Sequence, residues 1–92
     1  MKRPGPYDIV LSIAGHDEGK LFVVIAAEGE RILLCDGKNR RLDNPKCKSP
    51  KHVRLVERLE DKPRTDKEIR TTLALAAAKR AAEKEEEHHG ER

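Results

Sequence analysis

Short apolar runs separated by turn-forming residues constrain the fold of this 92-residue chain more than any other feature. Runs of β-branched and aliphatic residues cover positions 9–13, 21–27 and 31–35, and polar or glycine-containing segments separate them. Such runs are typical of β-strands. Glu28-Gly29-Glu30 predicts a tight hairpin between the second and third runs, and Asp36-Gly37 predicts a further turn. We therefore expect a β-meander in the first half of the chain.

Two more short strands are expected after this meander. Residues 40–42 can pair as a fourth strand and residues 53–56 as a fifth, and Asn44-Pro45 and Ser49-Pro50 interrupt the ladder between them. Five short strands within about fifty residues favour a small barrel, because closing the sheet removes its exposed edges. The predicted fold is mainly β, with a five-stranded barrel over residues 1–59 and a C-terminal α-helix.

The sequence changes character after residue 59. Residues 60–65 read as a polar linker, and Thr65 with Glu68 matches a capping box, in which the two side chains bond free amides at a helix start. The following residues are rich in Ala, Lys, Arg, Glu and Leu, which predicts a helix from residue 66 to about residue 84 within a C-terminal segment of 66–92. Glutamates at 85–87 oppose the helix dipole, so we expect a frayed polar end.

The helix has a short apolar stripe. Ile69, Leu73 and either Ala76 or Ala77 lie on one face, with Leu75 to one side. The first three turns can therefore dock on the barrel, while the rest is expected to be solvated. An Ala-rich helix can also bind a partner, although this composition favours a merely exposed helix.

Composition also limits the compartment. No apolar run approaches the roughly 20 residues of a membrane-spanning helix, and the first residues lack the apolar core of a signal peptide. Cys35 ends an apolar strand and reads as a core residue, while Cys47 lies among lysines without a catalytic base at a recognisable spacing. Two free thiols fit a reducing compartment. We expect a cytoplasmic protein that does not associate with membranes.

Positive charge is concentrated in one segment. Residues 36–58 hold eight Lys or Arg against three acids, whereas the rest of the chain holds twelve cations and fourteen acids. The whole net charge of +3 therefore comes from this segment. A localised excess of this kind is typical of a nucleic-acid footprint, although charge runs are also common on solvated surfaces.

The first loop carries a family resemblance. The stretch from Asp8 to Ile25 resembles the KOW motif, a strand, a glycine-framed loop and a second strand found in ribosomal proteins and in transcription factors of the NusG type. The match lies on Val10, Gly15, Gly19, Lys20 and Val23 or Val24. The two glycines would let the loop turn with positive φ and bring backbone amides close to a phosphate.

A wider pattern narrows this resemblance. The stretches 19–24, 33–38, 40–46 and 50–53 look like bacterial KOW-domain RNA-binding proteins related to large-subunit ribosomal proteins of archaea and eukaryotes. The similarity covers residues 7–59 and implies an SH3-like barrel and binding to ribosomal RNA. The chain departs from the family at His16, Asp17 and Glu18, where many members carry lysines. This departure moves the expected RNA contact from the loop to the segment after the third strand.

RNA contact is expected to run through phosphates, riboses and shape, because the chain lacks an aromatic platform for stacking bases. Prolines would brace the lysine-bearing loop at 46–51. Adjacent Arg40 and Arg41 would face opposite sides of a strand, so the basic surface must wrap an edge. The candidate RNA-binding residues are Gly15, Gly19, Lys20, Lys38, Arg40, Arg41, Lys46, Lys48, Lys51, His52 and Arg54.

Enzymatic motifs are missing from the sequence. It has no phosphate-binding GxxxxGK segment and no Ser/His/Asp set, and the pair His88-His89 lacks two further ligands for a metal. We therefore predict an RNA-binding monomer without cofactor or metal that docks on structured ribosomal RNA and contacts ribosomal proteins. The alternative is a protein-interaction module of the transcription or translation machinery that uses the barrel and the Ala-rich helix. Truncation after Leu59 would spare RNA binding under the first hypothesis and abolish association under the second.

Overall fold

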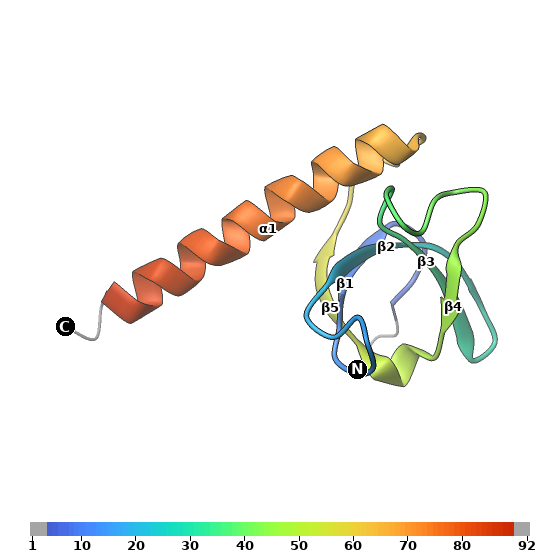
Figure 1. Ribbon diagram of the computed structural model, residues 1–92, viewed down its shortest axis with the longest axis horizontal. Coiled ribbons are helices and arrows are strands. Elements are labelled where there is room, and N and C mark those ends of the chain that lie inside the picture. The colour runs from blue at the N-terminus through green and yellow to red at the C-terminus, as the bar shows by residue number, and fades with distance from the viewer. Residues whose placement is uncertain (1–3, 90–92) are drawn as a thin grey trace.

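A curled antiparallel sheet and one long helix make up the fold (Figure 1). The computed structural model describes the backbone of residues 4–89 and the side chains of residues 4–83. The elements are β1 (Asp8–Ser12), β2 (Leu21–Glu28), β3 (Arg31–Cys35), β4 (Lys46–Lys48), the 3-10 turn η1 (Pro50–His52), β5 (Val53–Arg58) and α1 (Asp66–His89). The mainly β architecture with a C-terminal helix is thus confirmed.

The sheet has five strands in the order β4-β3-β2-β1-β5. Its pairing is shifted by irregularities between Ile9 and Val10 in β1 and between Val24 and Ala26 in β2. Bulges of this kind bend strands, and here the sheet curls so that its edge strands β5 and β4 lie opposite each other, with the short η1 segment between them in the chain (Figure 1). Over residues 4–89 no backbone ladder joins β4 to β5, so the sheet is curled but not closed.

The fourth strand is not where the sequence predicts it. Residues 40–42 form part of a turn, whereas Lys46–Lys48, expected as a proline-braced loop, pairs with β3 as β4. The backbone of this segment is used in a turn: the Asp36 carboxylate accepts the amide hydrogen of Arg40 at 2.8 Å, and the Arg40 carbonyl accepts two amides from the start of the same turn. Backbone groups used in a turn are not available to a strand ladder. The prolines at 45 and 50 therefore flank a strand rather than replace it.

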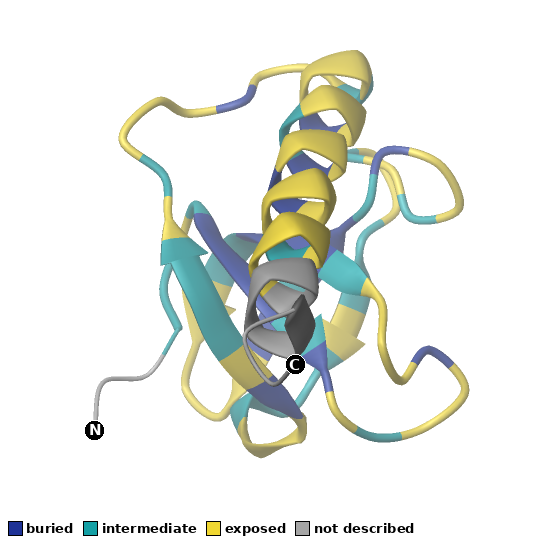
Figure 2. Cartoon of the chain, turned by 90° about the vertical axis from the view of Figure 1, so that its left-hand side faces the viewer, coloured by how far each residue is buried: buried dark blue, intermediate teal, exposed yellow. Residues whose placement is uncertain are grey.

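Apolar side chains form two clusters, one on each face of the sheet. Neighbouring Ile9 and Val10 point to opposite faces, as successive strand residues must. The concave cluster is Val10, Phe22, Val24, Ile32, Leu34 and Val53. The convex cluster lies under the helix and consists of Ile9, Val23, Cys35, Ile69, Leu73 and Ala76. Figure 2 shows α1 buried along the side that faces the strands and exposed on its outer side.

The helix is therefore part of the folded unit. Ile69, Leu73 and Ala76 are each less than 10% exposed, so the predicted apolar stripe does dock on the sheet. Removal of residues after 59 would uncover three strand residues that the helix now buries, namely Ile9, Val23 and Cys35. Truncation thus tests stability and binding at once, and point substitutions are needed to separate the two functional hypotheses.

The helix start follows the predicted capping box with one change. The Thr65 hydroxyl accepts the amide hydrogen of Glu68 at 3.1 Å, as expected, but the Glu68 carboxylate reaches back to the amide of Arg64 at 2.8 Å. The helix then continues to His89, beyond the predicted end near residue 84. The expected fraying at 85–87 stays a prediction, and residues 90–92 of the predicted polar end lie outside the described residues. Within residues 4–89, no helix combines the length and apolar character needed to span a membrane.

Gly37 is required where the turn after β3 meets the helix. Its φ is +77°, and an added Cβ would collide with the backbone carbonyl of Asp66 and approach the Arg70 Cγ at 2.9 Å. Replacement of Gly37 by Ala is therefore expected to lower the free energy of unfolding by about 2–3 kcal/mol, measured by urea denaturation. Gly29 also has positive φ but an open surrounding, so Gly29→Ala should cost about 1 kcal/mol. Equal losses in the two variants would contradict the steric role of Gly37.

Candidate nucleic-acid interface

The structure separates the predicted basic segment into three groups. One group lies in the turn after β3, one on β4, and one on η1 and the start of β5. In that order the groups are Lys38, Arg40 and Arg41; Lys46 and Lys48; and Lys51, His52 and Arg54. The three groups thus lie on different elements of the fold, and the β4 group has side-chain partners of its own.

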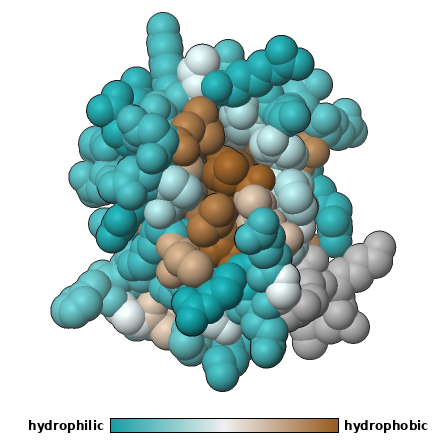
Figure 3. Space-filling view, turned by 90° about the vertical axis from the view of Figure 1, so that its right-hand side faces the viewer, coloured by the Kyte–Doolittle hydropathy of each residue, from teal (hydrophilic) through white to brown (hydrophobic). Residues whose placement is uncertain are grey.

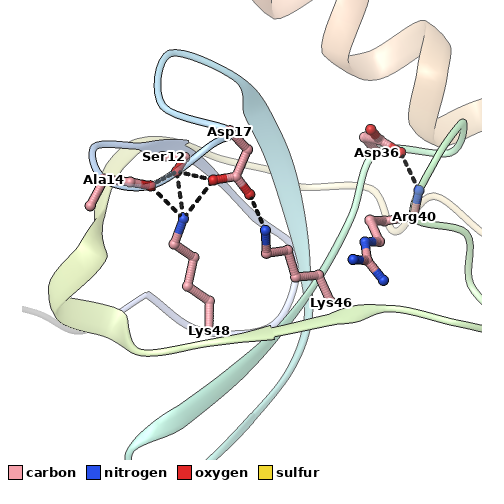
Figure 4. Close-up of polar contacts among 7 residues, drawn as sticks. All are labelled: Ser12, Ala14, Asp17, Asp36, Arg40, Lys46 and Lys48. Carbon is pink, nitrogen blue, oxygen red and sulfur yellow. Dashed lines mark hydrogen bonds and ion pairs between the residues drawn. The ribbon is translucent and has the colours of Figure 1, made fainter.

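The β4 lysines face a carboxylate of the first loop (Figure 4). The Lys48 ammonium donates to the Ser12 hydroxyl at 2.7 Å, the Ala14 carbonyl at 2.9 Å and Asp17 Oδ1 at 2.9 Å. Lys46 Nζ lies 2.6 Å from Asp17 Oδ2. Lys46 and Lys48 share this face because strand side chains alternate. We call these five residues the Asp17 lock.

The Asp17 lock removes Lys48 from the surface available to a ligand. An ammonium has three donors, and all three are engaged within the lock. The Lys48 side chain is 9% exposed, against 30% for Lys46. One carboxylate also offsets half of the charge of the two lysines. The lock therefore joins the first loop to the edge strand β4, and we leave Lys48 out of the proposed RNA contacts.

The lock perturbs the ionisation of Asp17. Burial opposes the charged form, but hydrogen bonds from Lys46, Lys48 and Ser12 outweigh it and hold the pKa of Asp17 far below its usual value of 3.8. A carboxyl group with a lowered folded-state pKa stabilises the fold above its unfolded-state pKa, and this stabilisation is lost as the pH falls below that value.

Acid should therefore weaken the lock. We expect the difference in unfolding free energy between the wild type and Asp17→Asn to stay constant from about pH 8 to pH 5 and to shrink below about pH 4. Urea denaturation at a series of pH values measures it. A difference that grows on acidification would contradict this assignment.

The glycine-framed loop adopts the expected backbone, but part of its amides already have acceptors within the protein. Gly15 and Gly19 have φ of +85° and +91°, as the sequence predicts. The amides of Glu18 and Lys20, however, donate to the carbonyls of Gly15 and Asp17 in the same loop, and the amide of Gly19 donates to the carbonyl of Ser12 at the end of β1. These amides are not free for a phosphate. The loop instead presents the side chain of Lys20, which is exposed.

The turn after β3 is fastened to the start of α1. The Asp36 carboxylate accepts the amide hydrogens of Lys38 and Arg40, which closes the turn. The Arg70 guanidinium donates to the Gly37 carbonyl at 2.6 Å. Further along the chain, the Asp66 carboxylate accepts the amide hydrogen of Leu42 at 2.8 Å. This fastening fixes Lys38 and Arg40 relative to the helix.

A groove of about 750 Å³ runs between α1 and the convex side of β1 and β2. Its rim carries four cations from three segments, which are Lys20, Lys38, Arg70 and Arg80. Asp36 is the only acid among the described residues that line it, and its carboxylate already accepts two backbone amides. We call this feature the cationic groove. Its charge and concave shape suit an anionic ligand.

Arg54 extends the cationic groove onto the edge strand. It is the cross-strand partner of Leu11, and Leu11 lines the groove. Directly paired residues of antiparallel strands share a face, so Arg54 lies on the same convex face as Leu11. The structure thus brings together Lys20, Lys38 and Arg54 from the predicted set. Lys51 and His52 remain on η1, outside the groove lining.

Sequence reasoning missed Arg70 and Arg80. Both flank the apolar stripe on one side, since residues 70, 73, 77 and 80 fall on neighbouring positions of one helix face. Both lie outside the basic segment 36–58, in a part of the chain where acids outnumber cations. The helical periodicity of the sequence, applied to charged as well as apolar residues, would have placed both arginines on the same side of the helix as Leu73.

The other side of α1 has the opposite charge. A smaller groove of about 300 Å³ is lined there by Glu57, Glu60 and Asp61 together with Lys79. Leu75 lies beside these acids and is 68% exposed. The helix therefore separates a basic side from a mainly acidic side, and an RNA would be repelled from the second.

An apolar row lies on the outer surface of β2, β3 and β4. Leu33 is paired with Ala26 on β2 and with Cys47 on β4, and all three are half-buried or exposed. Figure 3, which looks at the molecule from the β4 side, shows apolar side chains gathered within a hydrophilic rim.

The two cysteines differ in accessibility, since Cys47 is exposed and Cys35 is buried. Burial raises the pKa of Cys35 to about 11, with smaller contributions from Asp66 and Asp36. Cys47 is therefore the thiol accessible to a labelling reagent.

Neither the protein-family models nor the curated proteins include a match to this chain. The fold and the site define the class: a small protein with a curled five-stranded antiparallel sheet and a docked helix that together frame a cationic groove. Among the described residues, no three His, Cys, Asp or Glu side chains gather as a metal site would require. The side chains of His88 and His89 lie outside the described side chains.

Proposed function

We propose that this protein binds structured RNA by placing the phosphate backbone along the cationic groove. The observation that carries this proposal is the convergence of Lys20, Lys38, Arg70 and Arg80 on one concave surface. Arg54 adds a further cation on the same face. Cations that converge from separate elements at fixed positions match a phosphate backbone better than a flexible basic tail does.

The proposed contact set differs from the set predicted from sequence. It consists of the five cations of the groove and its edge, with Arg40 and Arg41 in the adjoining turn. Arg41 also pairs with Asp66 at 3.6 Å, but its side chain is 61% exposed and can reach a ligand. Lys46 and Lys48 support the first loop rather than contact RNA. Lys51 and His52 are exposed on η1 and form a separate, secondary contact.

Ribosomal RNA is the ligand we propose. The resemblance of residues 7–59 to KOW-domain RNA-binding proteins supports this choice, and the curled sheet is compatible with the SH3-like barrel of that family. The protein would act as a cytoplasmic, monomeric binding protein without enzymatic activity or cofactor. Ribosomal proteins near the RNA site would be its neighbours.

Co-sedimentation with purified ribosomal subunits tests this proposal. Saturable binding to one subunit that weakens as salt rises is the expected result. The double variant Lys20→Glu/Arg80→Glu, which reverses two charges of the groove, should not bind and should remain in the supernatant. Absence of co-sedimentation at low salt would contradict ribosomal RNA as the ligand.

A protein-interaction module is the second candidate, and the acidic side of α1 favours it. Leu75 is a large apolar side chain that is 68% exposed and flanked by Glu60 and Asp61, an arrangement suited to a basic protein segment with an apolar anchor. Leu75→Ser separates the candidates, because it leaves the cationic groove unchanged. Loss of subunit association in Leu75→Ser, with retention in Lys20→Glu/Arg80→Glu, would favour the interaction module.

A further inference from the structure

The cationic groove has an apolar floor that phosphate binding alone does not use. Leu11 and Leu21 line it from the sheet, and Leu73, Ala74 and Ala77 line it from α1. Both strand leucines are half-buried, and both alanines are exposed, so this surface is open to a ligand. A phosphate backbone would gain nothing from covering it, because apolar surface favours apolar or planar groups.

The floor lies between two arginines of the same helix. Arg70 and Arg80 are ten residues apart, which is about 15 Å along a helix axis. Ala74 and Ala77 fall between them, so the apolar surface has a cation at each end. A strand with a rise of about 3.4 Å per nucleotide places phosphates on both sides of a central base within that length. A cation, an apolar surface and a second cation along the helix therefore match the order phosphate, base, phosphate along an RNA strand.

We propose that the cationic groove accommodates the base of an unpaired nucleotide of the bound RNA, with its flanking phosphates on the arginines and lysines of the rim. This inference rests on the proposed function and specifies the part of the RNA that this site binds. It replaces the expectation from sequence that the protein contacts phosphates, riboses and shape and not bases. Aliphatic side chains take the place of the aromatic platform that the chain lacks.

Size and shape favour an unpaired base over a duplex. A volume of about 750 Å³ falls within the roughly 300–1,000 Å³ typical of sites for small molecules. Bases within a duplex are stacked and offer only their edges, so they cannot lay a face on the apolar floor. Asn39 also lines the groove, and its amide supplies both a donor and acceptors for the edge of an extruded base.

Three RNAs with the same stem test this inference. The first carries an internal bulge of unpaired nucleotides, the second is fully paired, and the third carries the same bulge with abasic sugars. We expect the bulged RNA to bind the full-length protein roughly tenfold more tightly than either of the others in fluorescence anisotropy. Equal affinity for the bulged and abasic RNAs would overturn the inference, because the phosphates alone would then account for binding.

Two leucine substitutions on the same helix supply the matched protein test. Ala77→Leu fills the groove without changing charge, whereas Ala78→Leu adds the same side chain at an exposed position outside the groove lining. Leucine is a good helix former, so both variants should retain the helical signal in circular dichroism. Ala77→Leu should lose the preference for the bulged RNA, with at least a fivefold fall in affinity, while Ala78→Leu should keep it.

The outcomes separate this inference from the proposed function. If paired and bulged RNAs bind equally and Lys20→Glu/Arg80→Glu abolishes both, the protein binds RNA but not through an unpaired base. If Ala77→Leu and Ala78→Leu behave alike towards the bulged RNA, the groove does not hold the base. If none of the three RNAs binds at low salt, both proposals are wrong.

Discussion

Replacement of Asp17 by Ala is expected to lower the free energy of unfolding by about 3 kcal/mol, measured by urea denaturation at pH 7. The substitution leaves the ammonium of Lys48 with a 9% exposed side chain and without its anionic partner. Removing one member of a buried ion pair is costly because the remaining charge is poorly solvated. We place the loss at the low end of the usual range because Lys46, at 30% exposure, can turn towards water.

Glu18→Ala is the matched control for Asp17→Ala. It removes a negative charge from the next residue of the same loop, but Glu18 is exposed, so the loss should stay within about 0.5 kcal/mol. The double variant Asp17→Ala/Lys48→Met should recover part of the stability, since it removes the buried charge as well. A loss below 1 kcal/mol in Asp17→Ala, or equal losses at both positions, would show that the lock does not stabilise the fold.

Charge reversal in the cationic groove should have the largest effect on binding. The double variant Lys20→Glu/Arg80→Glu is expected to weaken affinity for structured RNA about 100-fold at moderate salt, because two phosphate contacts become repulsive. Arg70 is left intact because its guanidinium also donates to the Gly37 carbonyl. A substitution there would change the stability of the fold as well as RNA binding. Fluorescence anisotropy with a labelled RNA measures the change.

Lys67→Glu/Lys79→Glu is the control for this prediction. It makes the same change in net charge, with both substitutions on α1, but Lys79 lines the acidic groove and neither lysine lines the cationic one. Long-range attraction would fall equally in both variants, whereas direct contact would not. Equal loss of affinity in the two double variants would mean that net charge, and not the groove, determines binding.

The regular parts of the fold could be predicted because their signals are local. The runs at 21–27 and 31–35, the Gly29 hairpin and the capping residue Thr65 each depend on neighbours in the sequence, and the structure confirms them. The position of the fourth strand could not be predicted in this way. It depends on the turn that Asp36 closes and on the distant residue Asp66, which takes the amide of Leu42.

The candidate site shows the same limit. Lys46 and Lys48 look like phosphate ligands in the sequence, and only the fold shows that both face Asp17, which is 29 and 31 residues away. The same Asp17 made the first loop look too acidic beside the KOW-domain proteins that the sequence resembles. Because it is paired within the lock, its charge no longer opposes binding at Lys20. Arg70 and Arg80 enter the site only because α1 docks beside the convex face.

The salt dependence of RNA affinity in the wild type and in the two double charge variants tests the central claim most directly. If about five cations of the groove region neutralise phosphates, the slope of log affinity against log salt should be about −4 in the wild type. Lys20→Glu/Arg80→Glu should reduce its magnitude by about 2, and Lys67→Glu/Lys79→Glu should leave it unchanged. A wild-type affinity that does not depend on salt, or the same slope in all three proteins, would contradict RNA binding through the cationic groove.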